Sequence, residues 1–131
     1  MTDCRILYCI VTKQGIQGSI SFIYYPEFDH FRIGYALKRS AWGKGLVTLC
    51  VNKALAHFFD NFGVHRIETY VFPENTASIR VLEKNGFKVL DRIMNARSYR
   101  WEDTDEFPDT TVIVDTKCKY YALNKTEYKF I

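Results

Sequence analysis

No run of apolar residues approaches the roughly 20 needed to span a bilayer as a helix, and no charged-then-apolar leader pattern opens the chain. The four cysteines, Cys4, Cys9, Cys50 and Cys118, form no C-x-x-C pair, and no histidine stands at a zinc-ligand spacing. We therefore expect no metal site, no membrane association, buried reduced thiols and a cytoplasmic location.

Clustered charge of one sign is also absent. The 18 basic and 15 acidic residues leave a net charge of +3 and are spread along the chain, without the Lys/Arg stripe of a nucleic-acid binder. One segment combines basic and aromatic residues, but acidic residues that would repel phosphates follow it at once; its members are Arg97, Tyr99, Arg100 and Trp101. A nucleic-acid module is therefore the weakest hypothesis, whereas a mildly basic protein still attracts a small polyanion.

The chain shows no internal repeat, low-complexity tract or linker. Its 131 residues are 47% hydrophobic and 25% charged, which is inside the range of globular domains. A chain of this length can bury a core without disulfides or metals. We expect one domain over residues 1–131.

The hydrophobic pattern of the first half predicts three strands and a helix. Residues 6–11, 16–25 and 31–37 are β-rich runs separated by polar turns, which predicts an antiparallel meander. Over residues 44–62, apolar side chains recur at the three-and-four spacing of an amphipathic helix, and Gly63 is placed to end it.

The second half predicts a strand over residues 65–72 and a helix over residues 75–85. A strand from residue 87 to about 93, a loop over residues 95–109 and a strand over residues 111–123 follow. The order is βββαβαββ. The expected fold class is α/β (α+β), a mixed, mostly antiparallel sheet with helices on its faces.

The turn Ser40-Ala41-Trp42-Gly43-Lys44-Gly45 joins a predicted strand to the first predicted helix. Its glycines let the backbone approach a ligand closely. The first N–H groups of the helix and the positive end of its dipole favour an anion such as a pyrophosphate. Two spaced glycines by themselves are more often a plain strand-to-helix turn, so the turn needs support from other segments.

That support comes from five segments, in this order: Ile33-Gly34-Tyr35, Trp42-Gly43-Lys44-Gly45-Leu46, His65-Arg66-Ile67-Glu68, Pro73-Glu74-Asn75-Thr76-Ala77-Ser78 and Glu83-Lys84-Asn85-Gly86-Phe87. Over about residues 16–93 the chain resembles the GNAT superfamily of N-acetyltransferases, most closely its RimJ/RimL branch. The resemblance implies acetyl-CoA as cofactor and transfer of the acetyl group to a primary amine, on a small molecule or a peptide N-terminus. The transfer would be a direct attack in a ternary complex.

The resemblance also implies which residues contact the cofactor: Leu37, Lys38, Trp42, Gly43, Lys44, Gly45, Leu46, Asn75 and Ser78. The backbone of the first two would pair with the pantetheine arm, the glycine turn would bind the pyrophosphate, and Asn75 and Ser78 would reach the thiol end. Ser40 stands where the family has Gln or Arg. Leu82 stands where other members carry a tyrosine acid, so Ser78 becomes the candidate catalytic acid.

Acetyl transfer requires a neutral amine, removal of its proton and stabilisation of the oxyanion. Because a thioester is already activated, positioning and a backbone N–H near Leu37 would supply most of the rate. Glu68 ranks first as general base, ahead of Asp29 and His30, but an exposed charge or a partner for Arg66 is the likelier role for its carboxylate.

The remaining candidates have ordinary explanations. His30, His57 and His65 fit surface or helix-face histidines, and Tyr35 and Tyr70 either line the acceptor site or belong to the core.

The first strand and two helices of a typical family member are expected to be missing. The apolar surface so exposed would favour a homodimer. The alternative function is an acyl-CoA-binding or interaction protein that has the GNAT fold but no turnover.

Overall fold

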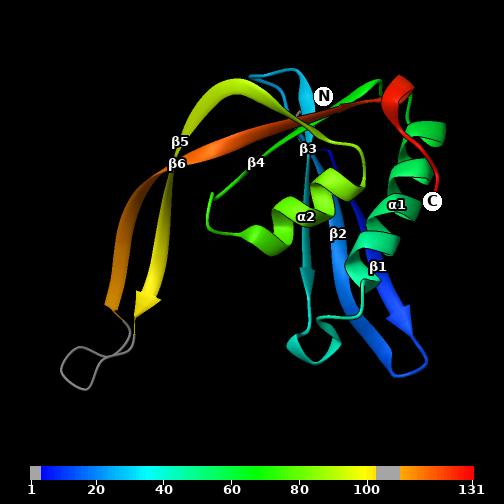
Figure 1. Cartoon of the computed structure of the whole chain (residues 1–131), viewed down its shortest axis with the longest axis horizontal. Coiled ribbons are helices and arrows are strands. Elements are labelled where there is room, and N and C mark those ends of the chain that lie inside the picture. The colour runs from blue at the N-terminus through cyan, green and yellow to red at the C-terminus, as the bar shows by residue number, and fades with distance from the viewer. Residues whose placement is uncertain (1–3, 103–109) are drawn as a thin grey trace.

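The structure is a computed structural model that describes residues 4–102 and 110–131, and describes side chains for residues 4–92 and 117–131. Six strands form one sheet in the order β1-β2-β3-β4-β6-β5 (Figure 1). All neighbours are antiparallel except β3 and β4, which are parallel. The strands are β1 (Arg5–Thr12), β2 (Gly15–Tyr25), β3 (His30–Leu37), β4 (Arg66–Val71), β5 (Lys88–Glu102) and β6 (Thr110–Asn124). The predicted fold class and the order βββαβαββ are confirmed.

Helix α1 (Leu46–Asn61) follows β3, and helix α2 (Thr76–Lys84) follows β4. Both contribute to one core cluster with the inward side chains of the sheet, so both lie on the same side of it, as Figure 1 shows. The α1 side chains Val51, Leu55 and Phe58 are fully buried at a spacing of four and three residues. Each contributes about 1.5–3 kcal/mol by leaving water. None of the described helices is long and apolar enough to cross a membrane.

Neither helix covers the other side of the sheet, which we call the open face. Arg5, Ile23, Arg32 and Glu68 are successive register partners across β1, β2, β3 and β4 and therefore share this face. Leu7, two residues along β1, is 59% exposed there.

The expectation of buried thiols is wrong for one of the cysteines. Cys9 is exposed, because it alternates with side chains that point into the core on the other side of β1. Cys118, on β6, is buried.

Strands β3 and β4 are joined over a short length. Their register consists of Phe31 opposite Ile67 and Arg32 opposite Glu68. Beyond these pairs the strands diverge, and a cavity opens between their carboxyl-terminal halves. The backbone of β3 from Ile33 onward therefore keeps one edge without a strand partner on the β4 side.

The predicted loop over residues 95–109 is wrong for its first part, because β5 continues to Glu102 and pairs with β6 down to Thr110. Residues 95–102 are mostly polar with aromatic residues among them, and their composition does not reveal that a partner strand will satisfy their backbone groups. The rest of the predicted loop, residues 103–109, lies outside the described residues. So do the side chains of residues 97–101.

The chain end helps to hold α1 in place. Asn52, which is fully buried on α1, donates to the Lys129 carbonyl and accepts from the Ile131 N–H, both at 3.0 Å. The Tyr128 hydroxyl donates to the Asn52 carbonyl at 2.9 Å. Because a buried amide without partners is costly, these contacts tie the C-terminal residues to the middle of α1.

Candidate functional site

A groove of about 730 Å³ lies where the end of β3, the turn before α1 and the start of α2 meet. Leu37, Trp42, Gly43, Gly45 and Leu46 line one part of it. Asn75 and Ser78 line the other part, at the beginning of α2. The structure thus brings together seven of the residues that the sequence predicts as cofactor contacts.

The amino-terminal end of α1 opens onto this groove. Gly45 is the N-cap, with a φ of 72°, and Gly43 has a φ of 78°. Only glycine adopts such angles without strain. Gly45 makes no side-chain capping bond, and the first helical bond is from Leu49 N–H to the Gly45 carbonyl at 3.2 Å. The earlier N–H groups of α1 have no helical acceptor and are available to an anion.

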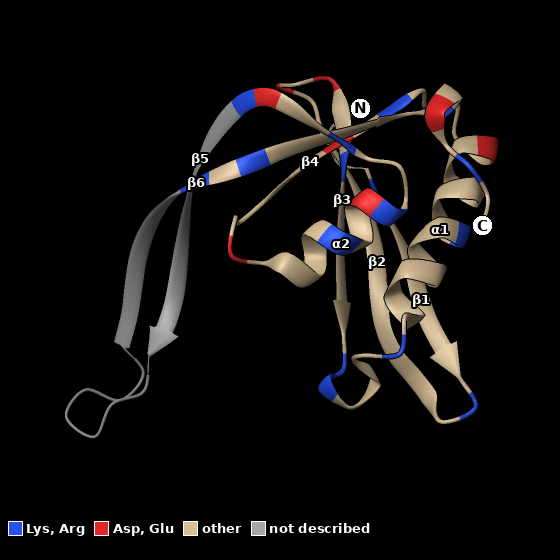
Figure 2. Ribbon diagram, in the orientation of Figure 1, with Lys and Arg blue, Asp and Glu red and all other residues tan. Residues whose placement is uncertain are grey.

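The same end of the molecule is basic. No Asp or Glu occurs between Asp29 and Asp60, whereas Lys38, Arg39 and Lys44 do. Figure 2 shows these blue segments around the short helix η1 (Arg39–Ala41) and the turn before α1, with no red nearby. The charge favours a polyanionic ligand over a neutral one.

Trp42 shapes the rim of the groove. Its indole N–H donates to the Leu37 carbonyl at 2.9 Å, and the Arg39 guanidinium lies 5.5 Å from its ring centroid. The ring is nevertheless 58% exposed. Trp42 therefore fixes the turn to the end of β3 and leaves one ring surface open to a ligand.

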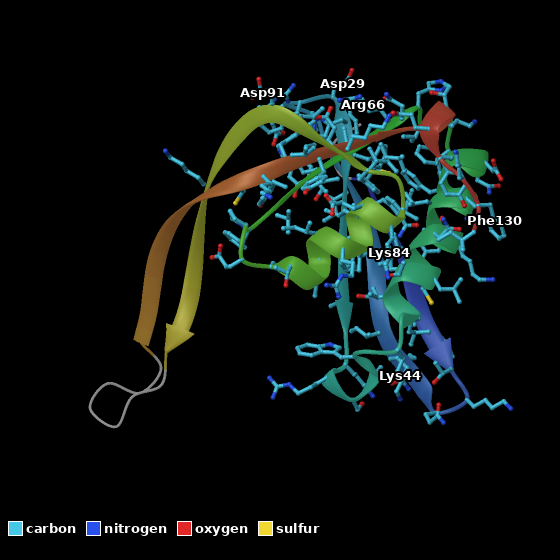
Figure 3. The ribbon with its side chains drawn as sticks, viewed as in Figure 1. Asp29, Lys44, Arg66, Lys84, Asp91 and Phe130 are labelled. Carbon is cyan, nitrogen blue, oxygen red and sulfur yellow. The ribbon has the colours of Figure 1, made fainter. Side chains whose placement is uncertain are left out.

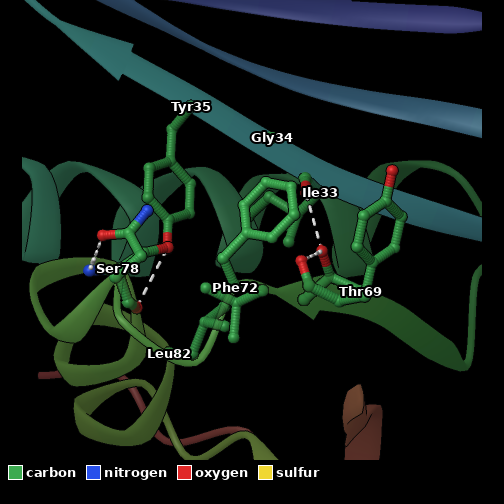
Figure 4. A pocket seen from close by; sticks show the side chains of 10 residues that line it. Ile33, Gly34, Tyr35, Thr69, Phe72, Ser78 and Leu82 are labelled. Carbon is green, nitrogen blue, oxygen red and sulfur yellow. Dashed lines mark hydrogen bonds between the residues drawn. The ribbon is translucent and has the colours of Figure 1, made fainter. Parts of the chain in front are cut away.

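A second cavity, of about 180 Å³, fills the divergence between β3 and β4. Figure 4 shows this cavity, which shares Tyr35, Asn75 and Ser78 with the groove, so the two spaces adjoin. Thr69 bridges its closed end by donating to the Ile33 carbonyl at 3.2 Å. A ligand with a long, narrow arm could pass from the α1 turn into the sheet.

Ser78 lies at the junction of the two spaces. Its hydroxyl is 2.7 Å from the Tyr35 hydroxyl, which also donates to the Ser78 carbonyl at 3.2 Å (Figure 4). Its backbone N–H donates to the Asn75 side chain at 3.2 Å, the capping bond of α2. Burial raises the pKa of Tyr35, which keeps the phenol protonated at neutral pH. Ser78 and Tyr35 together form a short hydroxyl chain that can carry a proton.

Leu82 lines the same cavity and is 1% exposed. It offers no proton, so the hydroxyl groups of Ser78 and Tyr35 are the described proton donors at this junction. The sequence interpretation missed the contact of Tyr35 with Ser78. The two residues lie 43 positions apart in the chain. The segment Ile33-Gly34-Tyr35 was singled out in the sequence, but it does not indicate which residue Tyr35 contacts.

Glu68 lines neither cavity. Its side chain is 11% exposed on the open face, with the Arg66 Nε 3.2 Å and the His30 Nδ1 3.6 Å from its Oε2 atom. Burial alone would raise the pKa of Glu68, but the Tyr120 hydroxyl, Arg66 and His30 beside it lower the pKa below its ordinary value. The carboxylate is ionised at neutral pH.

Two expectations for this region change. Glu68 is not an exposed charge but a partner for Arg66, the other ordinary role expected for it, and the side chain of His30 is 9% exposed rather than on the surface. Lys38 and Lys44 are not among the residues that line the groove, and their contacts with the cofactor stay a prediction. The Lys38 N–H already donates to the Gln17 carbonyl at 2.7 Å, and its carbonyl accepts from Ala41 at 2.9 Å.

The family model for the acetyltransferase (GNAT) domain matches residues 2–88. The chain is 35% identical over 86 residues to the probable N-acetyltransferase YjcK of Bacillus subtilis (strain 168), which covers 66% of this chain and 43% of that protein. It therefore spans less than half the length of this curated relative.

Solved structures agree on the fold. The MccE self-immunity acetyltransferase in complex with acetyl-CoA and AMP superposes with a TM-score of 0.68 at 21% identity, covering 92% of this chain and 61% of that chain. The RimL ribosomal-protein acetyltransferase in complex with coenzyme A gives 0.68 at 19% identity, covering 92% and 62%. Since the family model covers residues 2–88, more than half of the chain, the chain belongs to the GNAT acetyltransferase family.

Proposed function

We propose that this chain binds acetyl-CoA in the groove and transfers the acetyl group to a primary amine, by direct attack in a ternary complex. The observation that carries the proposal is the uncapped, positive-φ start of α1, which opens onto the same groove as Ser78. Family membership and two solved relatives that contain acetyl-CoA or coenzyme A support the choice of cofactor.

The cofactor would lie along the groove in three parts. Its pyrophosphate accepts hydrogen bonds from the N–H groups between Gly43 and Leu46, and the nearby basic residues add attraction. Its pantetheine arm pairs with the free edge of β3 up to Leu37. Its thioester enters the cavity between β3 and β4, beside Ser78.

The reaction needs no covalent intermediate on the protein. The amine nitrogen attacks the thioester carbonyl, a C–N bond forms, and the carbonyl oxygen becomes an oxyanion that a backbone N–H near Leu37 stabilises. The C–S bond then breaks. Ser78 donates its proton to the leaving thiolate and recovers one from solvent water through Tyr35.

Glu68 is the proposed acceptor for the amine proton. Its Oε1 atom is buried and has no hydrogen-bond partner among the described residues, and the Arg92 Nη1 atom lies 3.6 Å from it. A carboxylate with a lowered pKa is a weak base, but the nitrogen becomes positive and acidic as it attacks the carbonyl. The proton can leave at that stage.

Replacement Glu68→Gln is expected to lower kcat/KM for the amine by about 100-fold, which is typical of a lost acid–base group, with unchanged affinity for acetyl-CoA. Steady-state kinetics over a range of pH and calorimetry on the same preparation measure both. Because the native pKa of Glu68 is lowered, its carboxylate stabilises the fold above its unfolded pKa and stops doing so as the pH falls through the native value. A variant that loses only thermal stability at neutral pH, with kcat/KM intact, would show that Glu68 merely pairs with Arg66.

We further propose that the chain belongs to the RimJ/RimL-like branch. A protein N-terminus or a small-molecule amine would suit a RimJ/RimL-like enzyme. The second candidate function, acyl-CoA binding without turnover, is favoured by Leu82 in the cavity and by the position of Glu68 outside it. Calorimetric titration with acetyl-CoA followed by assay against a panel of amines separates the two: binding without acetylation of any amine supports the second.

We also propose a homodimer that buries the β1 edge of the open face, around Leu7, and leaves the part of that face around Glu68 accessible to the acceptor. Leu7 is 59% exposed on β1, so Leu7→Glu places a charge in that contact without disturbing the core. The wild-type protein is expected to elute as a dimer at micromolar concentration by size exclusion with light scattering, and Leu7→Glu as a monomer. Leu49→Glu is the matched control, because Leu49 is 43% exposed on α1, on the other side of the sheet. A monomeric wild type contradicts the proposal.

A further inference from the structure

Arg32, on the open face, is held in an aromatic cage. Its guanidinium carbon lies 4.7 Å from the ring centroid of Tyr25, 5.1 Å from that of Phe28 and 5.2 Å from that of Tyr70. Its Nε donates to His30 Nε2 at 3.4 Å. Its Nη2 atom is buried and has no hydrogen-bond partner among the described residues. The cage stabilises the cation by cation–π contacts but leaves this donor unused.

No described carboxylate pairs with Arg32. Glu68, its direct register partner, forms its ion pairs with Arg66 and Arg92 instead. Asp29, in the preceding turn, accepts from the Tyr24 hydroxyl. Burial and the nearby arginines lower the pKa of His30, against an opposing effect of Glu68, so this histidine is neutral at pH 7 and brings no charge of its own. A half-buried guanidinium without an anion is costly, and an incoming anion would relieve that cost.

The cage adjoins the closed end of the cavity between β3 and β4. Arg32 and Glu68 are the last paired residues of the two strands, and their successors Ile33 and Thr69 line the cavity. Tyr70 lines the cavity and also forms one wall of the cage. Figure 3 places Asp29, Arg66 and Asp91 together at one end of the molecule and Lys44 at the opposite end. The cage is thus far from the pyrophosphate turn and next to the expected position of the thioester.

We propose that the acceptor carries an anionic group, a carboxylate or a phosphate, close to its reactive amine, and that Arg32 binds this group. The inference rests on the proposed function and names the substrate class for the same site. Neighbouring strands are about 4.8 Å apart, so Arg32 and Glu68 can hold an anion and an amine that are separated by only a few bonds. A guanidinium matches the planar geometry of a carboxylate or phosphate.

Arg66 and Arg92 hold the Glu68 carboxylate in ion pairs, so Glu68 does not neutralise Arg32. A neutral amine would leave the Arg32 Nη2 atom without a partner.

The test compares acceptors in matched pairs that differ in the anionic group: glycine with glycinamide, β-alanine with propylamine, and O-phosphoethanolamine with ethanolamine, with diaminopropane as the cationic case. The anionic member of at least one pair is expected to have a kcat/KM about tenfold or more above its neutral partner, because a charge-assisted hydrogen bond is worth about that factor. The carboxylate and phosphate pairs show which anion is preferred. Preference for the neutral or cationic amines overturns the inference.

Arg32→Gln is expected to bring the ratio between anionic and neutral acceptors close to one, chiefly by raising KM for the anionic acceptor, with KM for acetyl-CoA unchanged. Arg80→Gln is the matched control, since Arg80 is exposed on α2, on the opposite side of the sheet. A ratio that survives in folded Arg32→Gln contradicts the role of Arg32. If that variant does not fold, the wild-type ratios still decide.

A binding measurement separates this inference from the proposed function. Calorimetry of the best anionic amine is run with coenzyme A present and again without it, so that neither turnover nor the cofactor is required. Binding that Arg32→Gln removes supports the inference even if acetyl-CoA fails to bind. Tight acetyl-CoA binding together with no preference for anionic amines, in binding or in turnover, keeps the cofactor proposal and refutes the anionic acceptor.

Discussion

Replacement Gly45→Trp is expected to lower the affinity for acetyl-CoA by more than about 100-fold, a loss of about 2.7 kcal/mol. Gly45 is the N-cap of α1, and a side chain added there meets no protein atom within 4 Å, so an indole would stand in the groove itself. It would cover the N–H groups that the pyrophosphate needs. Isothermal calorimetry with acetyl-CoA and with coenzyme A measures the loss.

A matched control separates obstruction from backbone strain. Gly63, beyond the other end of α1, has a φ of 64° and also has open space around its Cβ position. Gly63→Trp therefore carries a similar strain of about 1–2 kcal/mol but leaves the groove free. We expect it to bind acetyl-CoA as the wild type does. Equal loss in both variants, or full binding by folded Gly45→Trp, contradicts the assignment of the pyrophosphate to this turn.

Ser78→Ala is expected to lower kcat by about 100-fold, because the departing thiolate loses its proton donor. Affinity for acetyl-CoA should change by less than about tenfold, since a single neutral hydrogen bond contributes only about 0.5–1.5 kcal/mol. The capping bond of α2 uses the Ser78 backbone N–H and the Asn75 side chain, so the helix start survives the change. Steady-state kinetics with a thiol-detecting assay, and calorimetry on the same sample, give the two quantities.

Tyr35→Phe tests the other half of the hydroxyl chain. It removes the hydroxyl 2.7 Å from that of Ser78 and keeps the ring. If the two hydroxyls act as one unit, the double variant is expected to be about as slow as Ser78→Ala alone. Thr76→Ala, an exposed change in the same turn of α2, is the control and should leave kcat unaltered. Full activity in Ser78→Ala would show that water, and not Ser78, protonates the leaving thiolate.

Local patterns predicted most of the fold correctly. The three-and-four spacing of apolar residues predicted α1, and Asn75 predicted the start of α2, because helix periodicity and capping depend on neighbours in the chain. The glycine turn was also predictable, since a positive φ at Gly43 and Gly45 needs a residue without a Cβ atom. These signals act over a few residues, so a single sequence carries them.

The continuation of β5 to Glu102 was not predictable in this way. Strand propensity depends on the partner strand. Here β6 provides the hydrogen bonds for the residues after residue 95, and the composition of those residues alone does not predict that pairing. The family resemblance predicted the groove residues Leu37, Trp42, Asn75 and Ser78. Lys38, whose backbone it assigned to the pantetheine arm, and Lys44 are not among the lining residues. Which face a side chain takes at the end of a strand or in a turn depends on local geometry that a motif does not specify.

The chemistry at the centre of the molecule depends on contacts between distant parts of the chain. The order of the elements, the glycine turn and family membership follow from the sequence, because each rests on local periodicity or on a contiguous segment. The Tyr35–Ser78 hydroxyl pair, the burial of Glu68 and the unpaired Arg32 in its aromatic cage came only with the tertiary structure. Each of these joins residues from different strands or helices, and burial and charge pairing are properties of the packed sheet rather than of any one segment.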